Sequence, residues 1–233
     1  MVHKKLNLSR LKGKIIALDG PAGSGKSITT RKLAARLGFI YLDTGAMYRA
    51  LTYFALKNNI SPSDSTKLAI LAEKLHFEFK TSEDVNEVYI NNEEVTNHIR
   101  TPEVTLHVSE VSAHKGVRKA MVAKQKKMGI DGSIVAEGRD TTTVVFPDAD
   151  IKLFLTASVK IRAQRRLLDL IKMGVSTTLE EQEADIRRRD DYDSNRKNSP
   201  LKKASDAILV DTSEMTIEGQ VDYIISLIRS ILK

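Results

Sequence analysis

Residues 20–27 read Gly-Pro-Ala-Gly-Ser-Gly-Lys-Ser (GPAGSGKS), a complete G-x-x-x-x-G-K-[ST] pattern. The apolar run 15–18 precedes it, and an amphipathic stretch follows. Glycine lets the chain turn tightly, so successive backbone N–H groups and the N-terminus of the next helix can face one anion. Lys26 adds a mobile positive charge, and the Ser27 hydroxyl is a ligand for Mg²⁺. The stretch therefore predicts a loop that holds the phosphates of a nucleoside triphosphate.

The composition is that of one sizeable domain. The chain has 233 residues, of which 41% are hydrophobic and 29% charged. It contains no cysteine, which excludes disulfides and cysteine-ligated metals and fits a reducing compartment. Neither an apolar run of the ~18 residues that span a membrane nor the apolar core of a signal peptide is recognised. We therefore expect a cytoplasmic protein with no membrane partner. Nothing in the sequence marks an oligomer interface, so we expect a monomer.

The net charge of +7 raises the question of nucleic acid binding. Residues 1–14 carry five basic and no acidic residues, which leaves 32 basic and 30 acidic residues in the remainder. A surface that binds nucleic acid spreads its positive charge over the folded domain. We therefore interpret 1–14 as a solvated basic N-terminal arm and expect no obligate nucleic acid partner.

Beyond the loop, predicted strands alternate with predicted helices. The strands are expected at 14–18, 39–42, 133–136, 151–155 and 207–210. The helices are expected at 26–37, 45–58, 64–75, 102–113, 117–128, 161–172, from Thr178 to about Tyr192, and at 217–232. The alternation predicts an α/β fold: a three-layer P-loop kinase core in which helices cover both faces of a parallel sheet, with the site at the carboxyl ends of the strands.

Two segments depart from this alternation. Within 61–114, the residues from 76 to 95 alternate with a period of two around the turn signal Asn91-Asn92, which predicts a small antiparallel insertion. Within 162–198, the residues are densely charged, and Thr178 with Glu181 forms a capping box. We predict a single kinase domain, 15–233, with an acceptor-binding insertion at 61–114 and an arginine-rich helical lid at 162–198. The core would then comprise 15–60, 115–161 and 199–233.

Two short motifs after strands bear on the reaction. Residues 43–49 read DTGAMYR, so Thr44 and Arg49 can bind a second anion near the first; the alternative is a capped helix with a surface arginine. Arg139 and Asp140 follow another strand. The planar guanidinium of arginine suits phosphate, and aspartate accepts from an amino or hydroxyl group. The alternative is a local ion pair.

The charged segment supplies further arginines. They are Arg162, Arg165 and Arg166 on one helix face, then Arg187, Arg188 and Arg189, and finally Arg196 among Asp190, Asp191 and Asp193. Like charges one turn apart destabilise a helix unless an anion offsets them, although some of these arginines are expected to pair with Asp169, Glu181 or Asp185. With the two motifs, they predict phosphoryl transfer between two bound molecules under a flap that excludes water.

These motifs, in this order, resemble those of the bacterial cytidylate kinases, (d)CMP kinases among the nucleoside monophosphate kinases. The landmarks are DGPAGSGKS (19–27), LDTGAMYR (42–49), EGRDTTTVVFPDA (137–149) and RRDDYDSNR (188–196). The similarity covers nearly the whole chain. It implies ATP-dependent phosphorylation of CMP and dCMP, giving ADP with CDP or dCDP, with ATP and Mg²⁺ as cofactors and Ser27 as a ligand of the metal.

The resemblance also implies roles for individual residues. ATP would contact the phosphate loop and one lid arginine: Gly20, Pro21, Ala22, Gly23, Ser24, Gly25, Lys26, Ser27, Ile28 and Arg165. The base of CMP would contact Thr44, Ser109, Arg118 and Asp140. Its phosphate would contact Arg49, Arg139 and Arg196, and its sugar would lie near Arg189 and Asp193. The catalytic group would comprise Lys26, Arg139, Arg189 and Arg196.

One stretch departs from the family pattern. Residues 141–143 are all threonine, where the family usually has a glycine, and a Cβ there puts the backbone path or the approach to phosphate in doubt. Two other functions stay open: a small-metabolite kinase of the same fold, such as a shikimate-type enzyme, and a nucleic-acid-associated P-loop ATPase. The long insertion disfavours the first, and the near-neutral balance outside the arm disfavours the second.

Overall fold

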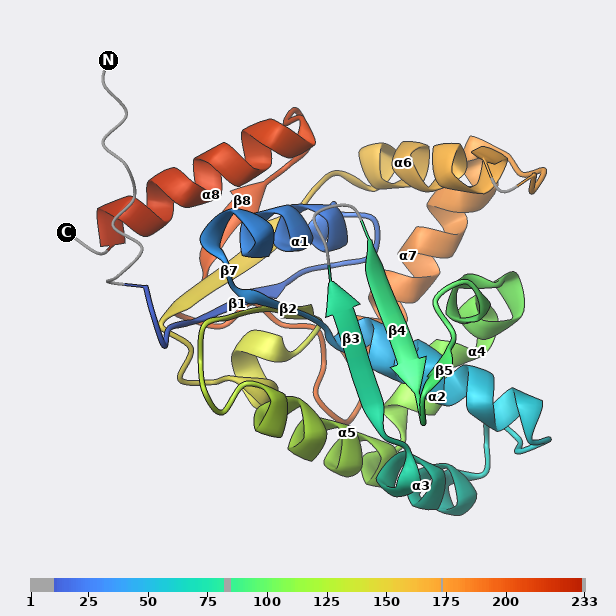
Figure 1. Ribbon diagram of the computed structural model, residues 1–233. Helices are drawn as coiled ribbons and strands as arrows, with labels where there is room; N and C mark the ends of the chain where they lie inside the picture. The colour runs from blue at the N-terminus through green and yellow to red at the C-terminus, as the bar shows by residue number, and fades with distance from the viewer. Residues whose placement is uncertain (1–10, 82–84, 173, 232–233) are drawn as a thin grey trace.

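The fold is built on one parallel sheet. The computed structural model describes residues 11–81, 85–172 and 174–231 (Figure 1). Its sheet has five strands in the order β2-β6-β1-β7-β8, all parallel. They are β1 (Ile15–Asp19), β2 (Ile40–Asp43), β6 (Ile134–Gly138), β7 (Ile151–Thr156) and β8 (Ile208–Asp211). The predicted α/β fold is confirmed, and all five predicted strands are present within two residues of the predicted bounds.

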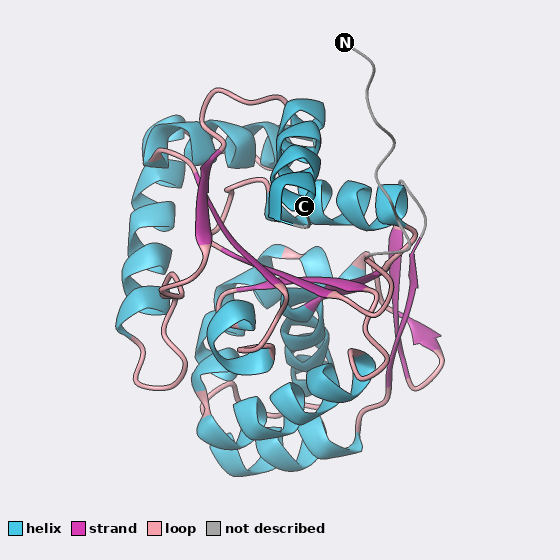
Figure 2. Ribbon diagram, turned by 90° about the vertical axis from the view of Figure 1, so that its left-hand side faces the viewer, coloured by secondary structure: helices cyan, strands magenta, loops and turns pink. Residues whose placement is uncertain are grey.

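Helices cover both faces of the sheet, which gives three layers (Figure 2). One face carries α1 (Lys26–Leu37) and α8 (Ile217–Ile231). The other carries α2 (Thr44–Lys57), α3 (Ser65–Lys74), α4 (Pro102–Ala113) and α5 (Lys115–Met128). Side chains of β1 alternate between the faces: Ile16 and Leu18 pack with α1 and α8, whereas Ala17 packs with the opposite cluster.

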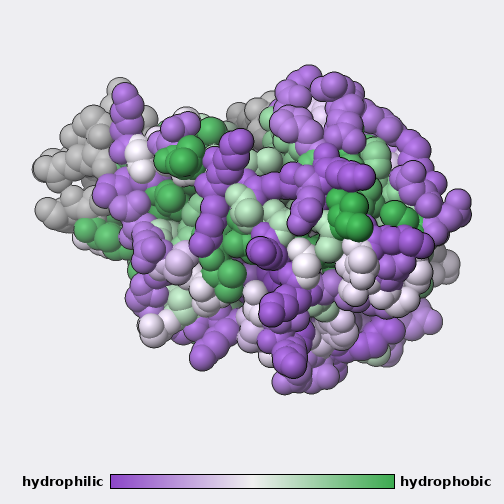
Figure 3. Space-filling model, turned by 90° about the horizontal axis from the view of Figure 1, so that it is seen from below, coloured by the Kyte–Doolittle hydropathy of each residue, from purple (hydrophilic) through white to green (hydrophobic). Residues whose placement is uncertain are grey.

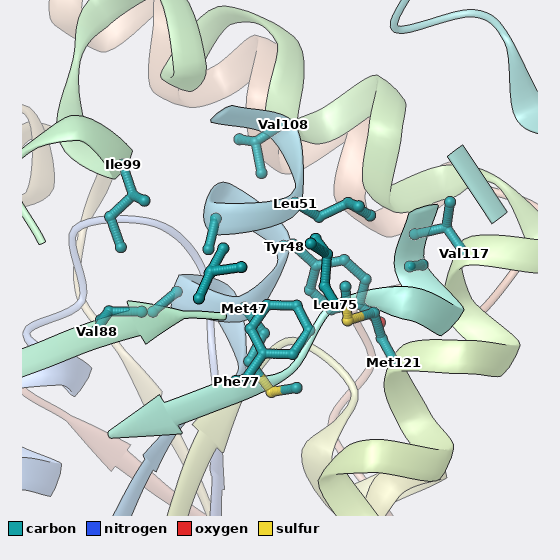
Figure 4. Close-up of a cluster of buried hydrophobic side chains, with 14 of the residues drawn as sticks. Met47, Tyr48, Leu51, Leu75, Phe77, Val88, Ile99, Val108, Val117 and Met121 are labelled. Atoms are coloured by element: carbon teal, nitrogen blue, oxygen red, sulfur yellow. The ribbon is translucent and has the colours of Figure 1, made fainter. Parts of the chain in front are cut away.

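The larger core cluster continues from the sheet into the predicted insertion. It joins Met47 and Leu51 of α2 to Met121 of α5 and to Val88 and Phe77 of a small antiparallel sheet (Figure 4). That sheet consists of β3 (Phe77–Thr81), β4 (Asn86–Ile90) and β5 (Glu93–Glu94). A short 3₁₀ helix, η2 (His98–Arg100), follows it. The insertion therefore shares its hydrophobic core with the main sheet.

The antiparallel sheet turns where the sequence predicts. Asn91 and Asn92 link β4 to β5, with φ angles of 49° and 69°. Asparagine tolerates the left-handed region better than most residues, which is why an Asn-Asn pair favours this tight turn.

The charged segment forms two helices, α6 (Val159–Lys172) and α7 (Leu179–Asn195), which pack against each other beside the sheet (Figure 1). The predicted capping box at the start of α7 is confirmed. Some arginines make ion pairs within the lid, as expected: Arg188 pairs with Asp185 at 2.9 Å. Arg162, by contrast, is buried, and its pair with Asp190 at 2.6 Å joins the two helices.

Packing of the domain begins before residue 15. Leu11 is fully buried in the cluster under α1 and α8, and Lys14 makes an ion pair with Asp150 at 2.7 Å. Residues 1–10 of the predicted basic arm lie outside the described residues. Among the helices of the described part of the chain, none has the length and apolar character needed to cross a membrane.

Candidate active site

The phosphate loop lies between β1 and α1, as predicted. Three of its glycines adopt positive φ angles: Gly20 at 152°, Gly23 at 75° and Gly25 at 86°. A Cβ on Gly20 would lie 1.9 Å from the carbonyl oxygen of Leu155, so no other residue fits there without moving β7. Gly25 is the N-cap of α1 and has no side chain to satisfy the first N–H groups of the helix, which suits an anion at that position.

Lys26 folds back into the loop. Its ammonium group donates to the carbonyl oxygen of Pro21 at 2.7 Å and to the hydroxyl of Ser24 at 3.3 Å. Burial and, to a lesser extent, the nearby positive charge of Arg139 lower the pKa of Lys26 to about 7, against the opposing effect of Glu137. The residue is thus a buried cation with two neutral partners in the loop, and an anion would stabilise its charged form.

Residues near the end of the chain support the loop. The hydroxyl of Thr212, just after β8, donates to the carbonyl oxygen of Ser24 at 3.0 Å. The hydroxyl of Thr29, on α1, donates to the side-chain oxygen of Gln220, on α8, at 2.6 Å. Both bonds are buried. The loop is therefore supported by residues that follow β8, at one edge of the sheet, and by residues of α8.

Helix α6 of the predicted lid also contacts the loop. Arg162 donates to the carbonyl oxygen of Ala22 at 3.1 Å. Arg165, predicted to contact ATP, donates to the carbonyl oxygen of Thr212 at 2.6 Å and approaches that of Gly23 at 3.5 Å. These two arginines thus link α6 to the backbone of the phosphate loop.

A buried aspartate joins the phosphate loop to the segment after β6. Asp19, the last residue of β1, accepts from the backbone N–H groups of Thr141 and Thr142, each at 2.7 Å, and from the Thr142 hydroxyl at 2.6 Å. Thr142 does not have a positive φ, so its Cβ causes no backbone strain. The backbone path is therefore not disturbed by the missing glycine, and the Thr142 side chain makes a hydrogen bond of its own.

A pocket of about 60 Å³ lies beside this junction. It is lined by all nine residues predicted to bind CMP: Thr44, Arg49, Ser109, Arg118, Arg139, Asp140, Arg189, Asp193 and Arg196. Residues that the sequence analysis did not assign also line it: Gly45, Tyr48, Val108, Ser112 and Gly138. Tyr48 follows Thr44 by four residues on α2, so helical spacing was a signal that could have identified it.

One end of the pocket contains a buried ion pair. Arg118 donates to the carboxylate of Asp140 through one nitrogen and to the carbonyl oxygen of Ser112, at 3.2 Å, through another. Its guanidinium carbon lies 5.3 Å from the centre of the Tyr48 ring. Both members of the pair are about 95% buried, which fixes a carboxylate and several N–H donors on one wall.

The other end gathers further arginines. Arg139 pairs with Asp193 at 2.9 Å, and Arg49 pairs with Asp43 at 2.9 Å. Burial lowers the pKa of Arg189 to about 10, and the charge of Arg139 acts in the same direction. Five arginines but only two aspartates line the pocket. Its electrostatics therefore favour an anionic ligand.

Several of these guanidinium groups are incompletely satisfied. Buried nitrogen atoms without a hydrogen-bond partner are Arg49 Nε, Arg118 Nε, Arg189 Nε and Arg196 Nη2. Buried polar groups are nearly always paired in native proteins, so an anionic ligand in this pocket would satisfy donors that the protein leaves unpaired.

A second buried carboxylate lies close to the phosphate loop. Glu137, the penultimate residue of β6, accepts a hydrogen bond from the Tyr41 hydroxyl. Burial raises the pKa of Glu137 and the charge of Asp43 raises it further, whereas Lys26, Tyr41 and Ser27 oppose the shift. The described residues contain no cluster of three or more histidine or carboxylate ligands. Ser27 and Glu137 bring a hydroxyl and a carboxylate together at the loop, and such oxygen ligands suit a Mg²⁺ ion that takes its remaining ligands from phosphate and water.

Comparison with known proteins places these motifs in a family context. The family model for cytidylate kinase matches residues 16–230. The bifunctional pantoate ligase/cytidylate kinase of Prochlorococcus marinus (strain NATL2A) is 50% identical over 93% of this chain, and the chain spans 42% of the length of that relative. The cytidylate kinases of Geobacillus sp. (strain WCH70) and Ligilactobacillus salivarius (strain UCC118) are 46% and 48% identical, over 92% of this chain and 96% of each relative.

A solved structure supports the fold alone. An uncharacterized protein from Eubacterium ventriosum superposes with a TM-score of 0.51 at 14% sequence identity. The match covers 93% of this chain and 99% of that one.

Proposed function

The chain belongs to the cytidylate kinase family, and on this premise we propose that it transfers the terminal phosphoryl group of ATP to the phosphate of CMP or dCMP. The observation that carries the proposal is the arginine pocket beside the phosphate loop, with its unpaired buried donors. A small-metabolite acceptor would need fewer groups than the nine that converge there, and a hydrolase would need no acceptor pocket.

The phosphate loop binds ATP, the phosphoryl donor. Backbone N–H groups of residues 22–28 surround the triphosphate, and Lys26 exchanges its contacts with Pro21 and Ser24 for phosphate oxygens. Mg²⁺, held through Ser27 near Glu137, supplies charge neutralisation at the phosphates. Arg165 extends from the lid over the same loop.

The base of the acceptor is selected by the ion pair. The Asp140 carboxylate accepts from the exocyclic amino group of cytosine, and Arg118 donates to the ring acceptors beside it. Uracil has a carbonyl oxygen in place of that amino group and would be repelled by the carboxylate. The fixed orientation of Asp140 therefore gives a preference for cytosine.

For the transfer itself, the protein aligns the two phosphates and neutralises their negative charge. An oxygen of the acceptor phosphate forms a bond to the terminal phosphorus of ATP while the bond from that phosphorus to the bridging oxygen of ADP breaks. The acceptor oxygen is already anionic, so no general base is needed. Arg139, Arg189 and Arg196 neutralise the transferring group, and the lid excludes water.

The decisive experiment is a coupled ADP-release assay with ATP and Mg²⁺. CMP, dCMP, UMP, AMP and shikimate are offered separately, with a sample lacking acceptor and a sample with RNA as controls. We expect turnover with CMP and dCMP well above all others. ADP release that is equal without acceptor, or that only RNA stimulates, would refute the proposal.

The proposed contact between Asp140 and the base can be tested with one variant. Asp140→Asn should lower kcat/KM for CMP by about ten- to a hundred-fold, because a charged hydrogen bond to the base is replaced by a neutral one. The ratio of CMP to UMP turnover should fall as well. An unchanged ratio would contradict the role of Asp140.

A further inference from the structure

A second hollow lies on the far side of Arg118. It runs between α5 and the residues that follow α7, and its volume is about 510 Å³. Lys115, Lys119 and Lys126 of α5 line it, together with Lys197 on the opposite wall. We call it the basic groove. None of the residue roles assigned to ATP or CMP uses these lysines.

The fold concentrates positive charge at this groove. The α5 sequence, KGVRKAMVAKQKKM, contains six basic residues and no acidic one, and residues 196–203 contain four basic residues and no acidic one. The near-neutral balance of residues 15–233 therefore does not describe the surface, because the fold brings two acid-free segments together. The face of the molecule seen from below is mostly hydrophilic, with a few small hydrophobic patches (Figure 3).

The four lysines are not neutralised by the protein. In the described part of the chain, none of Lys115, Lys119, Lys126 and Lys197 forms an ion pair with a carboxylate. Lys115 and Lys119 are one turn apart on the same helix, an arrangement that costs stability until an anion offsets it. The positive charges that line the groove are therefore not balanced by carboxylates of the protein.

The shape and chemistry of the groove fit a small phosphorylated ligand. It is an open surface hollow, and its volume of about 510 Å³ leaves room for a small molecule. No aromatic side chain lines it, so it lacks the stacking surface with which proteins bind single-stranded nucleic acid. Val122 and Val144 contribute an apolar wall, which suits a base or sugar, while the lysines suit phosphates.

The groove is physically connected to the acceptor pocket. Arg118 lines both spaces. On the opposite wall, the carbonyl oxygen of Ser199 accepts from Arg196 at 2.7 Å, and Asn198 donates to the carbonyl oxygen of Ala113, at the end of α4, at 3.2 Å. A ligand that orders this wall would therefore change the position of Arg196 in the pocket.

We propose that the basic groove is a second nucleotide site, which binds the phosphates of a nucleoside triphosphate and is coupled to the acceptor pocket through Arg118 and Arg196. The proposal that the groove binds a nucleotide does not depend on the function proposed above. The effect on CMP rests on that function.

Binding is tested with the active site blocked. The full chain is mixed with one equivalent of a bisubstrate inhibitor in which cytidine and adenosine are joined by a pentaphosphate, and labelled CTP or ATP is then added in equilibrium dialysis. We expect binding of about one further equivalent of at least one nucleotide. Lys119→Ala/Lys126→Ala should weaken it at least tenfold. The matched control Lys124→Ala/Lys127→Ala removes two charges from α5 outside the groove lining and should leave it within about twofold.

Competitors distinguish the source of the affinity. Displacement by inorganic tripolyphosphate at a similar concentration would show that phosphates alone are recognised, whereas displacement only by nucleotides would show a contribution from the base or sugar; both outcomes support the site. No binding beyond the blocked active site, or equal losses in both double variants, would overturn it. Tighter binding of a single-stranded RNA oligonucleotide than of either nucleotide would assign the groove to nucleic acid instead.

Coupling has its own measurement. In the absence of ATP, tripolyphosphate should change the Kd for CMP by about fivefold more in the wild type than in Lys119→Ala/Lys126→Ala, and CMP turnover is measured in parallel. Equal changes in both proteins would overturn the coupling. Absence of CMP turnover in any sample would refute the proposed function, while leaving the dialysis result intact.

Discussion

At the scale of single residues, the site keeps cations where little water reaches them. Lys26 is 5% exposed, and burial lowers the pKa of both Lys26 and Arg189. Such groups are costly in the free protein, and a polyanionic ligand removes that cost on binding. Part of the nucleotide affinity therefore comes from relief of repulsion among the protein's own charges.

Proton uptake reports this relief. With a pKa of about 7, Lys26 is mostly neutral at pH 8 in the free protein, and the triphosphate raises its pKa by opposite charge. Binding of ATP at pH 8 should therefore take up a proton, whereas binding at pH 6 should take up almost none at this residue. Titration calorimetry in two buffers of different ionisation enthalpy measures the difference, with Lys26→Met as the control. Equal uptake in the wild type and the control would contradict the assignment.

The Thr142 hydroxyl can be tested by a matched pair of variants. Thr142→Val keeps the shape but removes a donor from the buried Asp19, so the free energy of unfolding should fall by about 1–3 kcal/mol. Thr142→Ser keeps the donor and should remain close to the wild type. Denaturant unfolding with both variants gives the comparison. Equal stability of the two would mean that the hydroxyl bond contributes nothing.

At the scale of elements, sequence patterns correctly predicted those features whose structure depends only on residues close in sequence. The capping box of α7, the Asn91-Asn92 turn and the strand before the phosphate loop each follow from residues close in sequence. The π-helical turn η3 (Thr141–Val145) was not predicted, because it depends on Asp19, more than a hundred residues away. The conformation of such a segment depends on contacts with residues distant in sequence, and the hydrophobic periodicity does not reveal these contacts.

The site shows the same division. Arg139 and Asp140 stand out locally because they follow a strand, whereas Ser109 and Arg118 were assigned only through the family resemblance. Glu137 escaped assignment, because its proximity to the phosphate loop arises from the pairing of β6 with β1.

The attachment of the lid to the phosphate loop gives a third prediction. Arg162→Met keeps the aliphatic stem but loses the bonds to Ala22 and Asp190, so we expect a higher KM for ATP and a loss of about 1–3 kcal/mol in stability. Arg188→Met breaks an exposed pair with Asp185 on the same lid and should cost less than about 1 kcal/mol. Steady-state kinetics with thermal unfolding separates the two variants. Similar behaviour of both would argue against a specific role for Arg162.

At the scale of the whole molecule, the sheet separates two hydrophobic clusters, and the larger one includes the insertion. Ile90 of β4 belongs to the same cluster as Ala17 of β1 and is fully buried. Shared burial of this kind makes unfolding cooperative. The insertion is therefore not expected to unfold before the rest.

A core variant tests this cooperativity. Ile90→Ala should lower the free energy of unfolding by about 2–5 kcal/mol and shift one common transition for every spectroscopic probe. Ile70→Ala on α3, where the side chain is 48% exposed, is the control and should have a much smaller effect. Two separate transitions in urea, followed by circular dichroism and tyrosine fluorescence, would show that the insertion unfolds by itself.

The bonds from Thr212 and Gln220 to the phosphate loop region have a consequence for biosynthesis. The loop is translated before the residues that hold it, since Ser24 precedes Thr212 by 188 residues. Since nascent chains fold from their N-terminal end, the first strand and helix emerge long before their supports. The ability to hold ATP should accordingly appear only after β8 and α8 have left the ribosome. A ribosome-bound nascent chain that lacks β8 and α8 would carry the complete loop sequence without a rigid loop.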